Sequence, residues 1–241
     1  MSVAHYFTAG LILSIVAGCD SSPAVDENSA KTQSGNIGTI HPEIWPKQAS
    51  PFALDEGLEQ HVTDLVNKMS LEEKVGQTIQ ADIGSITPAQ VREYHLGSVL
   101  NGGNSAPGGD NRTTPAAWVA LADEFWLAST DKTDGRIGIP ALWGTDAVHG
   151  HNNIVGATLF PHNIGLGAAN NPALMHRIGT VTAKEILVTG LDWTFAPTIA
   201  VVRDDRWGRT YESFSEDPAI VRDFAGNLVE GLQGKLDDGT F

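Results

Sequence analysis

From residue 54 onward, apolar residues recur every three or four positions, a spacing that predicts amphipathic helices. The first helix is expected to bury one face, made of Leu54, Leu58, Val62, Leu65 and Met69. Ser70-Leu71-Glu72-Glu73 matches a capping box, so a second helix is expected to begin after Ser70. In that helix Leu71, Val75 and Ile79 are expected to point inward. Both helices are predicted to be packing elements.

A simple unit then repeats along the chain. A polar capping residue precedes a proline at Thr87-Pro88, Thr114-Pro115, Asn171-Pro172 and Asp217-Pro218. Proline suits the first helical position, where a backbone N–H would have no partner within the helix. Gly190 and Gly234 lie where two of these helices are expected to end. The apolar residues expected on helical faces are Val91, Tyr94, Trp118, Leu121, Ala122, Phe125, Leu174, Ile178, Val181, Val221, Ala225, Leu228 and Leu232.

Short apolar runs at 98–100, 141–143 and 193–196 lie between these helices and are predicted to be strands. Strands that alternate with helices indicate parallel βαβ units and an α/β fold. The links that follow the strands, roughly 101–113, 145–170 and 197–216, are longer than the links that precede them. This asymmetry is typical of a (β/α) barrel with its site at the carboxyl ends of the strands. A doubly wound open sheet is the alternative.

The segment from Ile139 to Gly167 holds an unusual number of polar residues directly after a predicted strand. It contains Asp146, His149 and His162, together with His151, Asn152 and Asn153. A long polar connection is uncommon inside a compact domain unless it is functional. We therefore interpret this segment as the floor and one wall of a ligand site.

Composition narrows the class of ligand. The chain is 41% hydrophobic and 18% charged, which is ordinary for a globular protein. Its net charge of −14 argues against a nucleic-acid partner. It contains neither G-x-G-x-x-G nor a Walker loop, so nucleotides are excluded and no cofactor is expected.

The loop at 203–217 places dense charge beside Trp207 and Tyr211, which suits sugar recognition. A carboxylate accepts bonds from neighbouring hydroxyls, a guanidinium donates a fork of bonds, and an indole covers the C–H face of a ring. Asp146 and Arg209 are expected to close on one sugar in this way. The alternative is a salt-bridged scaffold that holds the loop, formed by Arg203, Asp205, Arg206 and Glu212.

The histidines near Asp146 raise the alternative of a metal-dependent hydrolase built on His149, His151 and Asp146. His149 and His151 are two residues apart on a predicted loop, and H-E-x-x-H is missing. Hydrogen bonding of each histidine to loop carbonyls is favoured, and no metal site is predicted. The single cysteine, Cys19, excludes an internal disulfide and a cysteine-based metal site.

The N-terminus contains an apolar run, Phe7 to Ala17, that is too short to span a bilayer comfortably. It ends in Val16-Ala17-Gly18-Cys19, which resembles a bacterial lipoprotein signal, although Met1–Tyr6 holds no Lys or Arg. Residues 1–19 are predicted to be a signal peptide with a lipobox-like end, and 20–50 a flexible linker. The protein is expected to be exported, either periplasmic or anchored to the membrane through lipidated Cys19, in a Gram-negative bacterium. An apolar, disordered N-terminus is the alternative.

Four segments carry a resemblance to a known family: Trp143–Gly150, Ala157–Asn163, Arg203–Arg209 and Tyr211–Asp217. In order and spacing they resemble family 3 glycoside hydrolases, especially bacterial and plant β-glucosidases and exo-β-glucanases. The resemblance extends from about Leu54 to Gly234, and Lys68–Lys74 is similar to the family's opening helix.

This resemblance implies a retaining hydrolase with a first domain that is a (β/α)8 TIM-type barrel and a second α/β domain. Retaining enzymes use two carboxyl groups about 5 Å apart, one as nucleophile and one as acid/base. By this likeness Asp146 and Arg209 would bind hydroxyls of the non-reducing-end sugar. Tyr211, Glu212, Trp207 and His149 would support them. The family's xylosidase-like branch often carries Glu at the position of Asp146, so Asp146 favours glucose.

By the same resemblance, the nucleophilic Asp and the acid/base Glu fall downstream of Phe241, so no catalytic residue is expected within this chain. Residues 51–241 are expected to be the N-terminal part of the barrel, truncated before its completion and inactive alone. The full-length protein is expected to hydrolyse terminal β-D-glucosyl residues of β-glucosides or β-glucan oligosaccharides. A non-catalytic, surface-anchored sugar-binding protein is the alternative.

Overall fold

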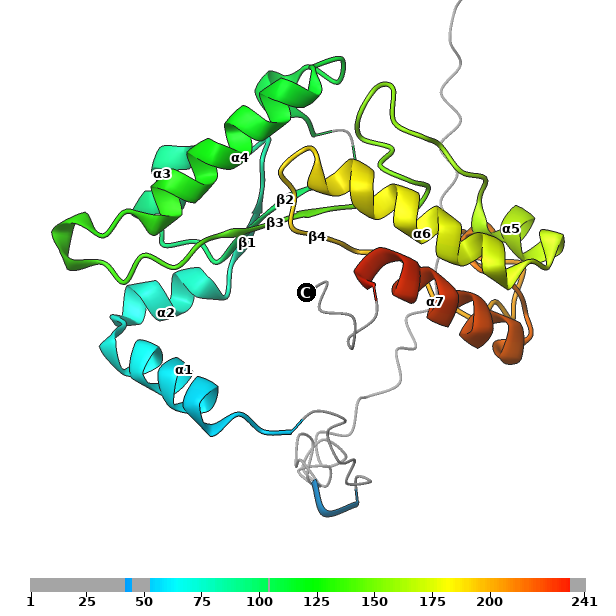
Figure 1. Ribbon diagram of the computed structural model, residues 1–241, viewed down its shortest axis with the longest axis horizontal. Helices are drawn as coiled ribbons and strands as arrows, with labels where there is room; N and C mark the ends of the chain where they lie inside the picture. Colours follow the sequence, from blue (N-terminus) through cyan, green and yellow to red (C-terminus); the bar gives the residue numbers. More distant parts are fainter. Residues whose placement is uncertain (1–41, 45–52, 104, 235–241) are drawn as a thin grey trace, which may run out of the picture. The chain divides into compact units, whose positions relative to one another are not determined.

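The computed structural model describes residues 42–44, 53–103 and 105–234 (Figure 1). The chain divides into two compact units, Met1–Ala53 and Leu54–Phe241. In the first unit the described residues include a short 3-10 helix, Pro42–Ile44. The predicted signal peptide, Cys19 and most of the predicted linker lie outside the described residues. The second unit contains the elements discussed below.

Four short parallel strands form one sheet: β1 (Gln80–Asp82), β2 (Ser98–Asn101), β3 (Leu142–Thr145) and β4 (Trp193–Thr194). Their order in the sheet, β1-β2-β3-β4, is their order in the sequence. A doubly wound sheet reverses its strand order at a switch point, so this sequential order favours the barrel type of fold. Within the described residues the sheet is open, because β1 and β4 do not pair with each other.

Seven α-helices accompany the strands in the described residues of the second unit. They are α1 (Glu56–Lys68), α2 (Leu71–Gln77), α3 (Pro88–Glu93), α4 (Pro115–Thr130), α5 (Asn163–Ala169), α6 (Pro172–Leu187) and α7 (Pro218–Gln233). One-turn 3-10 helices lie at Pro107–Gly109, Thr133–Gly135 and Thr210–Glu212. The predicted strands at 98–100, 141–143 and 193–196 correspond to β2, β3 and β4, whereas β1 and α5 were not predicted.

The predicted helix starts are confirmed. Ser70 and Glu73 form the expected capping box at the start of α2. All four prolines occupy the beginning of a helix, namely α3, α4, α6 and α7. Gly234 caps the end of α7 with a φ of 76°, a backbone conformation that favours glycine. These boundaries were readable because they depend on residues close in sequence.

The predicted buried faces of α1 and α2 are wrong. No residue of α1 is buried, and Leu71, Val75 and Ile79 are exposed in this unit. The buried residues of α2 are Glu73 and Gly76. The Glu73 carboxylate accepts bonds from the backbone N–H groups of Ser70 and Ile137. Gly76 lies so close to the Tyr94 and His95 carbonyls that a Cβ would overlap them. These tertiary contacts turn the polar face of α2 inward.

Two apolar clusters form the core of the unit. In the first, Trp143 of β3 stacks on Trp118 of α4 with ring centroids 5.7 Å apart, and Phe125 meets Trp143 edge-on. The second lies with α6 and α7, which run side by side in Figure 1, and includes Met175 and Phe224. Of the apolar positions expected on helical faces, six are buried: Val91, Trp118, Phe125, Ile178, Val221 and Leu228. The others are partly buried, except Tyr94 and Val181, which are exposed.

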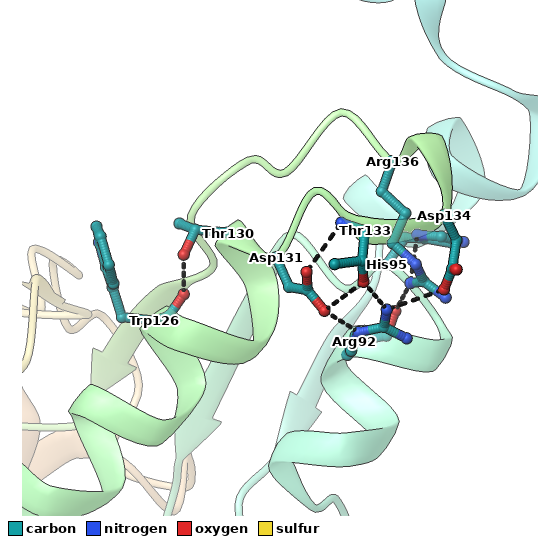
Figure 2. Close-up of polar contacts among 8 residues, drawn as sticks. All are labelled: Arg92, His95, Trp126, Thr130, Asp131, Thr133, Asp134 and Arg136. Atoms are coloured by element: carbon teal, nitrogen blue, oxygen red, sulfur yellow. Dashed lines mark hydrogen bonds and ion pairs between the residues drawn. The ribbon is translucent and has the colours of Figure 1, made fainter.

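Charged residues join α3 to the link between α4 and β3 (Figure 2). The Arg92 guanidinium pairs with Asp131 and Asp134 and donates to the Thr133 hydroxyl. Hydrogen bonds from Thr133 and Arg92 lower the pKa of Asp131 to about 2. This ionic cluster precedes β2 and β3, so it lies at the amino-terminal edge of the parallel sheet, opposite the long polar loops.

Candidate active site

Asp146 follows β3 directly, and its backbone is held by the neighbouring strand. The Phe195 N–H donates to the Thr145 carbonyl at 3.1 Å, and the Ala147 N–H donates to the Thr194 hydroxyl at 3.2 Å. Asp146 itself is half-buried. Two strands therefore fix the start of the loop that carries this carboxylate.

Side-chain amides and a buried hydroxyl also support the loop that begins at Asp146. The Thr145 hydroxyl accepts bonds from the side-chain amides of Asn101 and Asn153, each at 3.1 Å. Thr145 and Asn101 are fully buried. In the orientation that satisfies both atoms of its amide, Asn152 donates to the Asp146 carbonyl at 3.1 Å and the Gly150 carbonyl at 3.0 Å. The polar residues after β3 thus hold the backbone that presents Asp146.

Arg209 and Glu212 form a bidentate ion pair in the loop after β4. Arg209 Nε donates to Glu212 Oε1 at 2.9 Å, and Nη2 donates to Oε2 at 2.6 Å. This pairing raises the pKa of Arg209, and the negative charge of Asp146 adds to the effect. The hydrogen bonds from Arg209 lower the pKa of Glu212 in turn. The structure therefore brings Asp146 within electrostatic reach of the Arg209–Glu212 pair.

Three aromatic rings connect the two loops beside this pair. His162 contacts His149 with ring centroids 4.3 Å apart and Tyr211 with centroids 4.8 Å apart, both nearly perpendicular. Burial lowers the pKa of His149, and the adjacent His162 lowers it further. Tyr211 also contributes to the lowering of the pKa of the adjacent Glu212 carboxylate. The predicted supporting residues His149, Tyr211 and Glu212 are thus neighbours.

Trp207 and the other charged residues shape the loop itself. Trp207 takes part in backbone turns with Asp204 and Thr210, and its side chain is exposed. Arg206 pairs with Asp204 through a fork of hydrogen bonds. Salt bridges therefore do occur in this loop, as in the alternative, but in the described structure they join Arg206 to Asp204 and Arg209 to Glu212.

His151 points away from this site and into the core. Its Nε2 lies 2.9 Å from the Thr189 hydroxyl, its ring meets Trp118 edge-on, and its side chain is fully buried. The expectation that His151 bonds a loop carbonyl is wrong. This burial also removes His151 from a metal set with His149 and Asp146. Among the residues that the structure describes, no group of three or more His, Cys, Asp or Glu is arranged to hold a metal.

Comparison with known proteins identifies the family. The profile described as glycosyl hydrolase family 3 N terminal domain matches residues 70–239. The chain belongs to glycosyl hydrolase family 3. Among solved structures it is similar to an exo-1,3/1,4-beta-glucanase from a Pseudoalteromonas species, with 55% identity and a TM-score of 0.74. That match covers 80% of this chain and 24% of the glucanase.

Curated family 3 relatives agree with this assignment. The chain is 26% identical to a lysosomal beta glucosidase of Dictyostelium discoideum, over 96% of this chain and 30% of that protein. It is 30% identical to a periplasmic beta-glucosidase of Salmonella typhimurium, over 75% of this chain and 21% of that protein. The chain therefore spans between about a fifth and a third of the length of these relatives.

Family membership confirms the predicted fold class. The parallel βα units belong to a TIM-barrel-type domain with a sheet that is not closed within the described residues. The structure also shows loop-holding side chains to which the sequence interpretation gave no role: Asn101, Asn163 and Thr198. Asn101 ends β2 and Asn163 begins α5, whereas Thr198 lies in the loop after β4 with no local signal.

Proposed function

We propose that this chain supplies part of the glucose-binding subsite of a β-glucosidase or exo-β-glucanase. The complete protein would release terminal β-D-glucosyl residues from β-glucosides or β-glucans with retention of configuration. The observation that carries the proposal is that ring contacts from His162 to His149 and to Tyr211 join the loop that carries Asp146 to the loop that carries the Arg209–Glu212 pair. The glucosidase and glucanase relatives support the same reaction class.

The geometry suits a sugar ring with several hydroxyls. A guanidinium has five N–H donors, and Glu212 accepts from two of them, so the others remain for a ligand. The Arg209 side chain is 62% exposed, which leaves this donor surface accessible. The Asp146 carboxylate would accept bonds from one or two hydroxyls. Sugar binding is thus divided between a donor and an acceptor on neighbouring loops.

We assign no nucleophile and no acid/base to this chain. Retaining chemistry requires two carboxyl groups about 5 Å apart on either side of the scissile bond. Glu212 is committed to Arg209, and Asp146 is assigned to sugar hydroxyls. A β-glucosidase from Listeria innocua has been solved in complex with laminaribiose, at 27% identity and a TM-score of 0.55 to this chain. We propose that the ligand here is likewise a β-glucoside or β-glucan oligosaccharide.

The deciding experiment is an assay of the complete protein on an aryl β-glucoside, with and without Asp146→Ala. Release of glucose is expected. The substitution should lower kcat/KM about a hundredfold, because charge-assisted bonds worth about 3 kcal/mol would be lost. Binding of glucosides without turnover would instead establish the non-catalytic sugar-binding alternative. Unchanged kcat/KM in Asp146→Ala would remove Asp146 from the site.

We also propose that the protein is exported, with a signal peptide over 1–19, a linker over 20–50 and a lipid anchor on Cys19. The lipobox-like sequence that ends at Cys19 supports this, as does similarity to a relative named as periplasmic. In the part of the chain that the structure describes, no helix has the length and apolar character needed to cross a membrane.

A further inference from the structure

The buried amide of Asn163 joins the loop after β3 to the loop after β4. Asn163 is the first residue of α5 and is 3% exposed. Its Nδ2 donates to the Thr198 hydroxyl and to the Glu212 backbone carbonyl, each at 2.7 Å. A side-chain amide nitrogen carries two protons, so both are used for contacts across the two loops.

One turn later, the same face of α5 meets the same segment of backbone. A Cβ on Gly167 would overlap the Phe214 carbonyl, so only glycine allows this approach. Residues four positions apart lie on one face of a helix, which places Asn163 and Gly167 together. Leu166 and Phe214 also share the second core cluster. Helix α5 is therefore packed directly against residues 212–214.

The backbone around Glu212 is also held by residues 198–200 of the loop after β4. The Thr198 hydroxyl donates to the Glu212 carbonyl at 3.1 Å. The next residue, Ser213, is 1% exposed and donates through its hydroxyl to the Ala200 carbonyl at 2.7 Å. Contacts from residues outside the 210–212 turn thus fix the backbone at Glu212 and, with it, the orientation of the Glu212 side chain.

The Glu212 carboxylate in turn orients the Arg209 guanidinium through their two parallel hydrogen bonds. We propose that Asn163 is a positioning residue, which orients Arg209 toward the sugar by holding the Glu212 carbonyl. This inference rests on the proposed function, because it assigns Arg209 to sugar binding. Asn163 itself would touch no substrate.

Isosteric substitutions separate this role from simple packing. Asn163→Asp keeps the shape of the side chain but replaces the donor NH2 group with an acceptor oxygen. Two acceptors, the carboxylate and the Glu212 carbonyl, would then face each other with no hydrogen bond between them. Thr198→Val removes the hydroxyl that bonds the same carbonyl, and Thr198→Ser retains that hydroxyl. If the proposal is right, all of these effects pass through Arg209.

The test measures kcat/KM of the complete protein on an aryl β-glucoside, with each substitution made in the wild-type and Arg209→Met backgrounds. In the wild-type background, Asn163→Asp is expected to lower kcat/KM about 10- to 100-fold, and Thr198→Val less. Thr198→Ser should stay near the wild-type value. In the Arg209→Met background, the same changes should cost less than about threefold, because coupled residues are not additive. Equal losses in both backgrounds, or no loss, would overturn the proposal.

Asn171→Ala is the matched control, since Asn171 also begins a helix but bonds only locally, to the Leu174 N–H at 3.1 Å. It should lower the melting temperature and leave kcat/KM unchanged. If Asn163→Asp does not fold, the Thr198 pair decides the question.

Calorimetric titration with glucose distinguishes the two proposals. A wild type that binds glucose without turnover would reject hydrolysis, while the affinities of the variants would still test Asn163. A wild type that neither binds nor hydrolyses would reject both.

Discussion

Glu212 binds Arg209 through two parallel hydrogen bonds, while the Glu212 side chain is only 14% exposed and the Arg209 side chain is 62% exposed. The acceptor is therefore sheltered and the donor faces solvent. In such a pair the carboxylate orients the guanidinium, whose remaining N–H groups stay available to a ligand.

We expect Glu212→Gln to lower kcat/KM on a β-glucoside about 10- to 100-fold, although Arg209 itself is not substituted. Glutamine offers one acceptor oxygen and turns an NH2 group toward the guanidinium, so one of the two bonds is lost along with the charge. Steady-state kinetics of the complete protein provide the measurement.

Asp204→Asn is the matched control, because Asp204 forms a similar fork with Arg206 on an exposed part of the loop. Exposed ion pairs contribute little to stability. A comparable loss of kcat/KM in this variant would show that loop charge in general, rather than the Arg209–Glu212 pair, governs the activity.

Asp146→Glu should shift sugar preference. The side chain is one methylene longer, so its carboxylate would enter space near the sugar ring that a smaller pentose leaves free. We expect the ratio of kcat/KM for an aryl β-glucoside to that for an aryl β-xyloside to fall. Asp205→Glu, on the exposed part of the neighbouring loop, should leave this ratio unchanged. A rise in the ratio for Asp146→Glu would contradict the assigned contact.

His151 predicts how stability depends on pH. Burial lowers the pKa of His151 to about 4, whereas an exposed imidazole titrates near 6.5. Between these values the unfolded chain binds a proton that the folded chain does not, so stability falls as the pH drops. The full difference is about 3 kcal/mol at pH values below 4.

Melting curves between pH 7 and pH 4 would measure this effect. His151→Gln keeps a polar group toward Thr189 but takes up no proton, so its melting temperature should fall less steeply than that of the wild type. His61→Gln, on the exposed surface of α1, should follow the wild-type curve. Parallel curves for the wild type and His151→Gln would show that another group controls the acid transition.

Two glycines on helices are expected to respond oppositely to the same change. Gly167→Ala would force α5 away from the Phe214 carbonyl and should lower both the melting temperature and kcat/KM. Gly226→Ala on α7 meets no atom within 4 Å and should stabilise the protein by about 0.5–1 kcal/mol. Thermal unfolding and kinetics test both. Tolerance of alanine at 167 would show that the close packing of α5 is dispensable.

Cys19→Ser tests the proposed anchor. If the sequence that ends at Cys19 is a lipoprotein signal, radiolabelled palmitate will be incorporated into the wild type and not into this variant. The variant should also leave the membrane fraction. Membrane association that persists in Cys19→Ser would place the anchor elsewhere.

Features that depend on neighbouring residues could be predicted from the sequence, as the helix starts show. Ser70 caps α2 by accepting a bond from the Glu73 N–H, and each of the four prolines begins a helix. Such features depend on residues at most a few positions apart. Strand β1 escaped prediction because Gln80-Ala81-Asp82 is short and lacks β-branched residues. The buried face of α2 escaped it because Ile137 lies 64 residues from Glu73.

The candidate site divides in the same way. That the loops carrying Asp146 and Arg209 lie next to each other could be anticipated, since loops after neighbouring parallel strands share one edge of a sheet. The role of Asn163 could not, because its partners lie 35 and 49 residues away and share no sequence pattern with it. Nor could sequence show that the His149 and His162 rings meet edge-on whereas His151 enters the core.

Helix α5 has a consequence for loop engineering. Asn163 and Gly167 are fitted to the backbone at 212–214, so the loops after β3 and β4 form one interlocked module. Grafting either loop alone from a relative would pair mismatched surfaces and displace Arg209. An exchange of loops intended to change substrate specificity should therefore replace residues 146–169 and 195–217 together, because α5 forms the contact between the two loops.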